Sequence, residues 1–386
     1  SEKGEYNMRR GSTISLGKIF GIPIALDYSW FLIFALLTWA LAVGYYPLEF
    51  RNWSLALYWI VGAATSIMLF VSVLLHELGH SVVAVWYKIP VQSITLFIFG
   101  GVSRITKEPA NPLSEFVISF VGPLVSFVLG GIFFVITPVF ATGSPLMGLV
   151  KYLAFINVAL GVFNLIPGYP LDGGGVLMSL IWKITDNMRR ATLIAANVGR
   201  VVAFLFIIYG VYQAFTGNII DGLWIAFIGW FLLNAAGSQI EQVKVEDLLA
   251  GHKVADAMSR NYATVPGDTT LEQLVDEHIL GGGRRSLIVE EDGRTLGILT
   301  LHRLKEIPRG QWPAKTAAQA VIPLEEMRKI QPDAELWSAM QEMARDGVNQ
   351  LPVMQDGEIV GMITREDVIS YLHTLQEISS GRWMAL

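Results

Sequence analysis

Two histidines and a glutamate lie together in the segment His76-Glu77-Leu78-Gly79-His80. Because positions four apart share one face of an α-helix, the imidazoles of His76 and His80 can bind one Zn²⁺ together. Glu77 lies beside them, where its carboxylate can take a proton from a metal-bound water. The alternative is a short polar patch at a helix end, since this pattern also arises by chance. The spacing favours zinc-dependent hydrolysis.

A catalytic zinc needs a third protein ligand and an open position for water. The other four histidines all lie beyond residue 250, and the chain has no cysteine, so we expect the third ligand to be a carboxylate. Asp172 is the best candidate, because prolines and glycines in residues 164–174 break a helix there and let the backbone turn a carboxylate inward. The competing interpretation is that Asp172 caps a helix.

The elements that must position these side chains are hydrophobic. The chain is 53% hydrophobic and 16% charged, a composition typical of a membrane protein. The ionisable side chains of residues 76–80 lie inside an apolar segment, where they are costly and indicate a functional site. Six apolar segments are long enough to cross a bilayer, near residues 27–47, 54–87, 113–140, 146–167, 191–215 and 219–240.

Basic residues give these segments an orientation. Only Arg51 and Lys151 lie on one side, so the positive-inside rule predicts that both termini are cytoplasmic. His80 and Asp172 then lie towards the same, cytoplasmic side. Residues 12–26 and 91–105 have the composition of short strands at that face. The basic residues of the cytoplasmic side are Arg9, Arg10, Lys18, Lys88, Arg104, Lys107, Lys183, Arg189 and Arg190.

The chain resembles the site-2 protease family of intramembrane metalloproteases in residues 76–80, in Asn164–Gly174 and in Gly122-Pro123-Leu124. The resemblance implies that His76, His80 and Asp172 hold zinc and that Glu77 is the general base. It also implies that Asn164 and the strands near residues 91–105, with Gly100 and Gly101, receive the substrate. Asn164 could instead bond to a neighbouring helix, and the two glycines could form only a turn. The family usually has Arg after Asp-Gly-Gly, whereas Gly175 stands here.

Beyond residue 244 the sequence becomes polar and contains two copies of one unit, offset by 64 to 65 residues. Each copy predicts a helix, a strand, an Asp-Gly turn, a strand and a helix. The copies resemble a CBS-domain pair, which implies an adenine nucleotide (ATP, ADP or AMP) bound through Thr364 and Asp367. In the first copy Arg303 replaces the ribose-binding Asp. Thr364 and Asp367 could instead serve only as a helix cap.

We therefore expect a polytopic α-helical membrane protein with six transmembrane helices, short membrane-associated β-strands and a cytoplasmic α/β CBS pair. The expected domains are residues 1–243 for the protease and residues 248–308 and 315–378 for the pair. The predicted function is a zinc metalloendopeptidase of the cell membrane. It would cut within or near the transmembrane helix of a membrane-protein substrate, and adenine nucleotide would tune it.

Two other functions explain the sequence less well. A transporter gated by the pair would explain the intramembrane charges but not the matched third ligand. An inactive, metal-free scaffold would not need the complete set of His76, Glu77 and His80. Residues 241–386 carry a net charge of −8, which gives no support for nucleic-acid binding. Because CBS pairs commonly associate, we also consider a homodimer through the pair.

Overall fold

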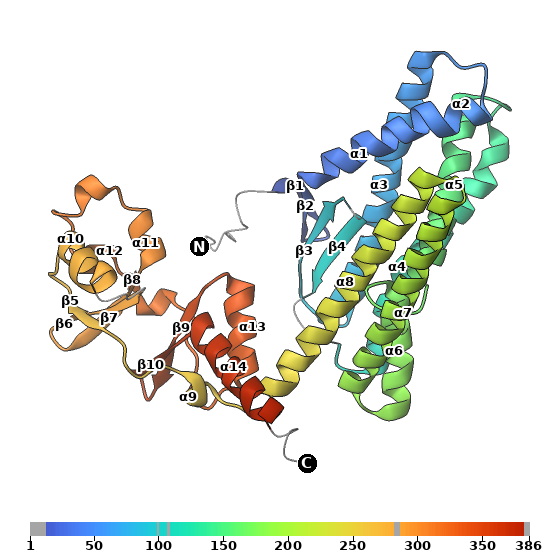
Figure 1. Ribbon diagram of the computed structural model, residues 1–386. Helices are drawn as coiled ribbons and strands as arrows, with labels where there is room; N and C mark the ends of the chain where they lie inside the picture. Colours follow the sequence, from blue (N-terminus) through green and yellow to red (C-terminus); the bar gives the residue numbers. More distant parts are fainter. Residues whose placement is uncertain (1–12, 99, 106–108, 282–285, 382–386) are drawn as a thin grey trace. The chain divides into compact units, whose positions relative to one another are not determined.

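The computed structural model describes residues 13–98, 100–105, 109–281 and 286–381 (Figure 1). The chain divides into two compact units, Ser1–Val243 and Lys244–Leu386. Three of the basic residues used for the orientation, Arg9, Arg10 and Lys107, lie outside the described residues.

Six helical segments of the first unit are long and apolar enough to cross a membrane, as predicted. The first combines α1 (Ser29–Trp39) and α2 (Tyr46–Glu49), joined by a π-helical stretch. A shorter helix that the sequence analysis did not separate, α6 (Asp172–Thr185), lies between the fourth and fifth spans. The other spans are α3 (Leu55–Trp86), α4 (Pro112–Ile136), α5 (Pro145–Asn164), α7 (Met188–Phe215) and α8 (Ile219–Leu249).

Polar caps determine where these helices begin. The side chains of Ser54, Asn111, Ser144 and Asn187 each accept a hydrogen bond from a backbone N–H in the first turn that follows. A cap of this kind satisfies one of the four unpaired N–H groups at a helix start. In α4 and α5 a proline then occupies the first helical position, where its missing N–H costs nothing.

Four strands form one sheet beside α3, in the order β1-β2-β3-β4 (Figure 1). They are β1 (Thr13–Ile19), β2 (Ile22–Asp27), β3 (Val91–Phe97) and β4 (Gly100–Ile105). β2 and β3 pair in parallel, and the other two pairs are antiparallel. The short strands predicted in residues 12–26 and 91–105 are confirmed, and β4 is an edge strand of this described sheet.

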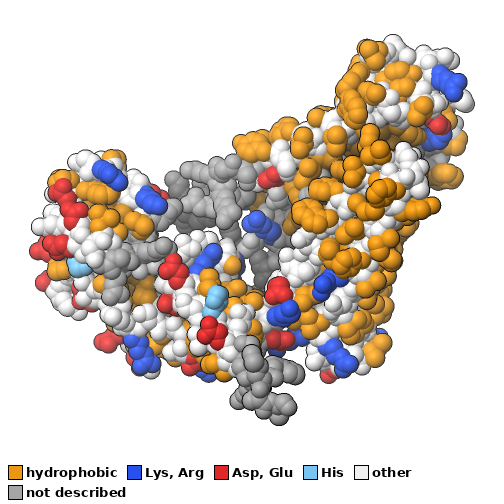
Figure 2. All heavy atoms as spheres, viewed as in Figure 1, with side chains coloured by type: hydrophobic (Ala, Val, Ile, Leu, Met, Phe, Trp, Pro, Cys, Tyr) orange, Lys and Arg blue, Asp and Glu red, His pale blue; other side chains and the backbone are white. Residues whose placement is uncertain are grey.

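The surface of the first unit is largely apolar. On the face drawn in Figure 2, hydrophobic side chains cover much of the helical unit. Large apolar side chains exposed on its helices include Trp39, Phe134 and Phe215. Such a surface is costly in water and suited to lipid, which agrees with the predicted transmembrane helices.

The second unit contains the two predicted copies, and each carries a β-hairpin with an Asp-Gly turn. Asp292-Gly293 and Asp356-Gly357 all have positive φ, as a tight type I′ hairpin turn requires. Residues 248–308 contain α9 (Val254–Ala257), β5 (Thr264–Pro266), α10 (Leu271–Leu274), β6 (Ser286–Glu291), β7 (Arg294–Thr300) and α11 (Leu301–Lys305). Residues 315–378 contain α12 (Ala317–Ala320), β8 (Ile322–Pro323), α13 (Leu336–Asp346), β9 (Gln350–Gln355), β10 (Glu358–Thr364) and most of α14 (Arg365–Gly381), and β8 pairs with β7.

One boundary differs from the expectation. The last apolar segment predicted from the sequence ends near residue 240, but α8 continues as a helix to Leu249. Leu249 is fully buried in the core of the second copy, together with Val254, Leu336 and Val368. The C-terminal end of α8 therefore belongs to the CBS pair.

Candidate metal centre

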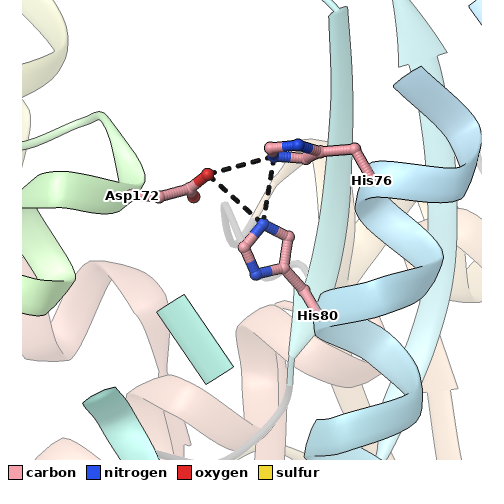
Figure 3. Close-up of side chains that lie close together, drawn as sticks. All are labelled: His76, His80 and Asp172. Carbon is pink, nitrogen blue, oxygen red and sulfur yellow. Dashed lines mark hydrogen bonds and ion pairs between the residues drawn. The ribbon is translucent and has the colours of Figure 1, made fainter. Parts of the chain in front are cut away.

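Three side chains from two helices converge in the first unit (Figure 3). His76 and His80 project from one face of α3, and Asp172 projects from the first residue of α6. The Oδ2 atom of Asp172 lies 3.0 Å from Nε2 of His76 and 3.4 Å from Nε2 of His80. The two Nε2 atoms lie 3.2 Å apart. The structure thus brings together the three ligands predicted from the sequence.

These separations fit a single zinc ion. Ligand atoms about 2.0–2.1 Å from a tetrahedral Zn²⁺ lie roughly 3.3 Å from one another, and the three measured edges range from 3.0 to 3.4 Å. Two imidazole nitrogens and one carboxylate oxygen are also a typical donor set for a catalytic zinc with an open fourth position.

The outer nitrogens of both rings have hydrogen-bond partners that orient the inner ones. Nδ1 of His80 donates to the carbonyl oxygen of Ile118 over 2.6 Å, because a carbonyl can only accept. Nδ1 of His76 lies 2.9 Å from the hydroxyl of Ser126, which is fully buried on α4. With Nδ1 protonated, each Nε2 presents its lone pair to the cluster, the arrangement that metal-binding histidines need.

Gly122 provides the space in which the cluster lies. A Cβ atom at this position of α4 would overlap Nε2 of His80 and lie 2.8 Å from Nε2 of His76. Only glycine therefore leaves room for the two ligating nitrogens. Gly122 is part of the family resemblance, but no role in the site was predicted for it, although a Gly-Pro pair inside an apolar helix is a visible signal.

A tight loop holds Asp172 in place. Tyr169 donates its backbone N–H to the carbonyl of Ala195 on α7, and a Cβ on Gly199 of α7 would overlap the Tyr169 carbonyl. Leu171 is the N-cap of α6, and no side chain caps this helix. The carboxylate of Asp172 therefore faces the two histidines and does not cap α6.

Glu77 points to β4. Its Oε2 accepts a hydrogen bond of 2.8 Å from the hydroxyl of Ser103, and a Cβ on Gly101 would lie 2.5 Å from its Cγ. Gly101 thus lies against the candidate base, whereas a Cβ on Gly100 would meet open space. Asn164 is half-buried at the end of α5, and no hydrogen bond links it to the cluster within the described residues. Ser103 was not identified from the sequence.

The candidate nucleotide residues lie at the start of α14. The hydroxyl of Thr364 donates to Oδ2 of Asp367 over 2.6 Å, and the backbone N–H of Asp367 donates back to that hydroxyl. This is the helix-cap arrangement that we gave as the alternative. In the first copy, Arg303 forms an ion pair of 2.8 Å with Glu306.

Each of the two units matches a known protein family. The family model described as peptidase family M50 matches residues 64–147 and 141–208, and the CBS-domain model matches residues 254–310 and 321–374. The Synechocystis sp. protein sll0528, provisionally named a zinc metalloprotease, is 36% identical over 369 residues, covering 94% of this chain and 96% of that protein.

One further relative is similar over most of this chain, and one solved structure is similar over a shorter part of it. Rip3 of Mycobacterium tuberculosis, also provisionally named a zinc metalloprotease, is 33% identical over 366 residues, covering 92% of this chain and 91% of Rip3. Among solved structures, a site-2 protease from Methanocaldococcus jannaschii is 32% identical. The match covers 59% of this chain and 95% of that chain, with a TM-score of 0.42.

Proposed function

Because this chain belongs to peptidase family M50, we propose that it cuts peptide bonds within or near the transmembrane helices of other membrane proteins. The chain is a multi-pass zinc metalloprotease of the site-2 type with tandem CBS domains. The observation that carries the proposal is the cluster of His76, His80 and Asp172, with donor atoms 3.0 to 3.4 Å apart on apolar helices. A protease accounts for this cluster better than the transporter or the scaffold does.

The chemistry divides between the bound ion and the side chains. His76, His80 and Asp172 would hold the zinc, which would supply a Lewis acid and a nucleophilic water at neutral pH. Glu77 accepts the proton of the attacking water and passes it to the leaving amine nitrogen. The carbonyl of Ile118 keeps the imidazole of His80 in the ligating tautomer, and the hydroxyl of Ser126 orients the imidazole of His76.

The substrate reaches this site as an extended chain. A transmembrane helix hides its carbonyl groups in hydrogen bonds, so it must unwind before it can be cut. An unwound segment can add as a strand to the free edge of β4. The contact between Gly101 and Glu77 supports this arrangement, because it sets that strand beside the base. We assign Gly100 and Gly101 to substrate binding on this basis, and we assign Asn164 to it because it belongs to the family motif of residues 164–174.

The membrane orientation follows from charge. Lys88, Arg104 and Lys183 lie in the stretches that the positive-inside rule assigns to the cytoplasm. We propose that both termini face the cytoplasm, that the protein lies in the cell membrane, and that the cut falls within the substrate helix or at its cytoplasmic edge.

The CBS pair is proposed to bind an adenine nucleotide and to tune the protease. Thr364 and Asp367 would contact the phosphate or sugar and the ribose in the second copy. The path for coupling is α8, which reaches from the last apolar span to Leu249 in the core of that copy. The pair would also be the surface through which two chains associate.

The test of the protease is cleavage of a defined membrane peptide. Purified full-length protein with zinc should cut a lysine-flanked Leu/Ala segment of about 20 residues with a central Asn-Pro to weaken its helix, a length that spans a bilayer. Mass spectrometry should locate the cut within the apolar segment. Glu77→Gln should keep its zinc but cut at least about a hundredfold more slowly, the usual contribution of a general base. No cleavage by the zinc-loaded wild type, or equal cleavage by Glu77→Gln, would contradict the proposal.

A further inference from the structure

Glu77 forms a hydrogen-bonded chain with two serines that have no assigned role. The hydroxyl of Ser103, on β4, donates to Oε2 of Glu77 over 2.8 Å. The hydroxyl of Ser81, on α3, lies 3.1 Å from that of Ser103. Ser81 is fully buried and lies one helical turn beyond Glu77, on the same face of α3.

The order of donors in this chain follows from proton counting. A serine hydroxyl has one proton, and Ser103 gives its proton to the carboxylate. Ser81 must therefore donate to Ser103, and the chain runs from Ser81 through Ser103 to Glu77. A hydrogen bond to a carboxylate is stronger than one between neutral groups, so this chain restrains one oxygen of Glu77 and leaves the other for the attacking water.

The register of β4 places Ser103 and Gly101 on one face. Side chains two apart in a strand point the same way, and both of these positions meet Glu77. Val102, between them, is 46% exposed and points to the other face. β4 therefore contacts Glu77 at two positions. Gly101 allows the backbone of the strand to approach the side chain of Glu77, and the hydroxyl of Ser103 donates a hydrogen bond to its carboxylate.

We infer that Ser103 is a positioning residue that fixes the general base to the substrate-binding strand. Pairing of an unwound substrate with β4 then acts on the same strand that orients Glu77, so docking and proton transfer are linked through one side chain. This inference rests on the proposed role of Glu77. In a purely structural role, the hydroxyl of Ser103 would serve only as the hydrogen-bond partner of Ser81, and its loss would not change proton transfer by Glu77.

The experiment compares Ser103→Ala, Ser103→Thr and Ser15→Ala in the full-length zinc-loaded protein. With the lysine-flanked peptide, Ser103→Ala should lower kcat by about tenfold to a hundredfold, the effect of one hydrogen bond to a charged group. KM should change by less than about twofold, because uniform substrate binding is untouched. Ser103→Thr keeps the hydroxyl and should restore kcat. Ser15→Ala removes an exposed hydroxyl from β1, at the opposite edge of the sheet, and should match the wild type in kcat and zinc content.

A second readout does not depend on cleavage. Acetohydroxamate, a small zinc chelator whose bound form places a proton against the general base, should bind Ser103→Ala and Glu77→Gln about tenfold more weakly than the wild type by calorimetry. Wild-type affinity and wild-type kcat in Ser103→Ala would overturn the inference. So would a rise in KM alone, or a loss that Ser103→Thr does not restore. Loss of cleavage in Glu77→Gln with unchanged Ser103→Ala would leave the proposed function intact and reject only this step.

Discussion

At the scale of single residues, the candidate centre depends on how closely α4 approaches α3. Both imidazoles use one nitrogen for an orienting partner on α4 and turn the other to Asp172. Gly122 lies between those partners in the sequence, at the point where any side chain would occupy the space of the ligating nitrogens. A metal site here therefore requires a glycine at position 122 as well as the four-residue spacing of His76 and His80.

Gly122→Ala should therefore weaken zinc binding, so that the dialysed protein retains less zinc, without unfolding the helix. The added methyl group would overlap Nε2 of His80, and changes to the groups around metal ligands commonly cost about 10- to 100-fold in metal affinity. Gly131→Ala, on the same helix, is the matched control, because a Cβ there meets nothing within 4 Å. Metal analysis and thermal unfolding of both variants make the comparison. Full zinc content in Gly122→Ala would show that the ligands lie elsewhere.

At the scale of elements, apolar length predicted the membrane helices well but not their ends. A run of about 20 apolar residues is explicit in the sequence, because a bilayer requires it. Hydropathy reports whether a helix lies in an apolar environment and not where its backbone hydrogen bonds stop. The charged residues after Ile240 therefore suggested the end of a helix, whereas α8 continues to Leu249. For the same reason α6, with 14 residues, was too short to stand out as an element of its own.

Site residues that lie close together in the sequence were easier to predict than those that meet only in the folded protein. His76 and His80 are four apart on one helix, so their pairing follows from helix geometry alone. Asp172 is 96 residues from His76 and was reached by elimination among carboxylates. Ser103 and Ser126 carry no signal, since a serine in an apolar helix or a short strand has many possible partners. Only the packing of α4 and β4 against α3 shows which partner each one has.

At the scale of the whole molecule, the two units share one helix. α8 includes the last apolar span, and its C-terminal end supplies Leu249 to the core of the second CBS copy. A nucleotide can change proteolysis only if it favours one arrangement of the pair over another. Coupling of this kind is typically about 1–3 kcal/mol, which corresponds to a change of roughly 5- to 150-fold in affinity or population.

Calorimetry of the full-length protein with ATP, ADP and AMP tests the nucleotide site. Asp367→Ala should weaken binding by about 1.5–3 kcal/mol, the range for a hydrogen bond to a charged group. Arg303→Ala, at the matching position of the first copy, is the control and should leave binding unchanged. If none of the three nucleotides binds at millimolar concentration, or if Asp367→Ala binds as tightly as the wild type, the second copy does not hold the nucleotide in this way.

The central claim is that His76, His80 and Asp172 hold one catalytic zinc, and the metal content of purified protein tests it most directly. Wild type and Glu77→Gln should each carry close to one zinc per chain, whereas Asp172→Ala should lose most of it, because two imidazoles alone make an incomplete zinc site. His76→Ala and His80→Ala should behave like Asp172→Ala. A stoichiometric zinc in Asp172→Ala, or full proteolysis by wild-type protein verified to be free of metal, would contradict this account.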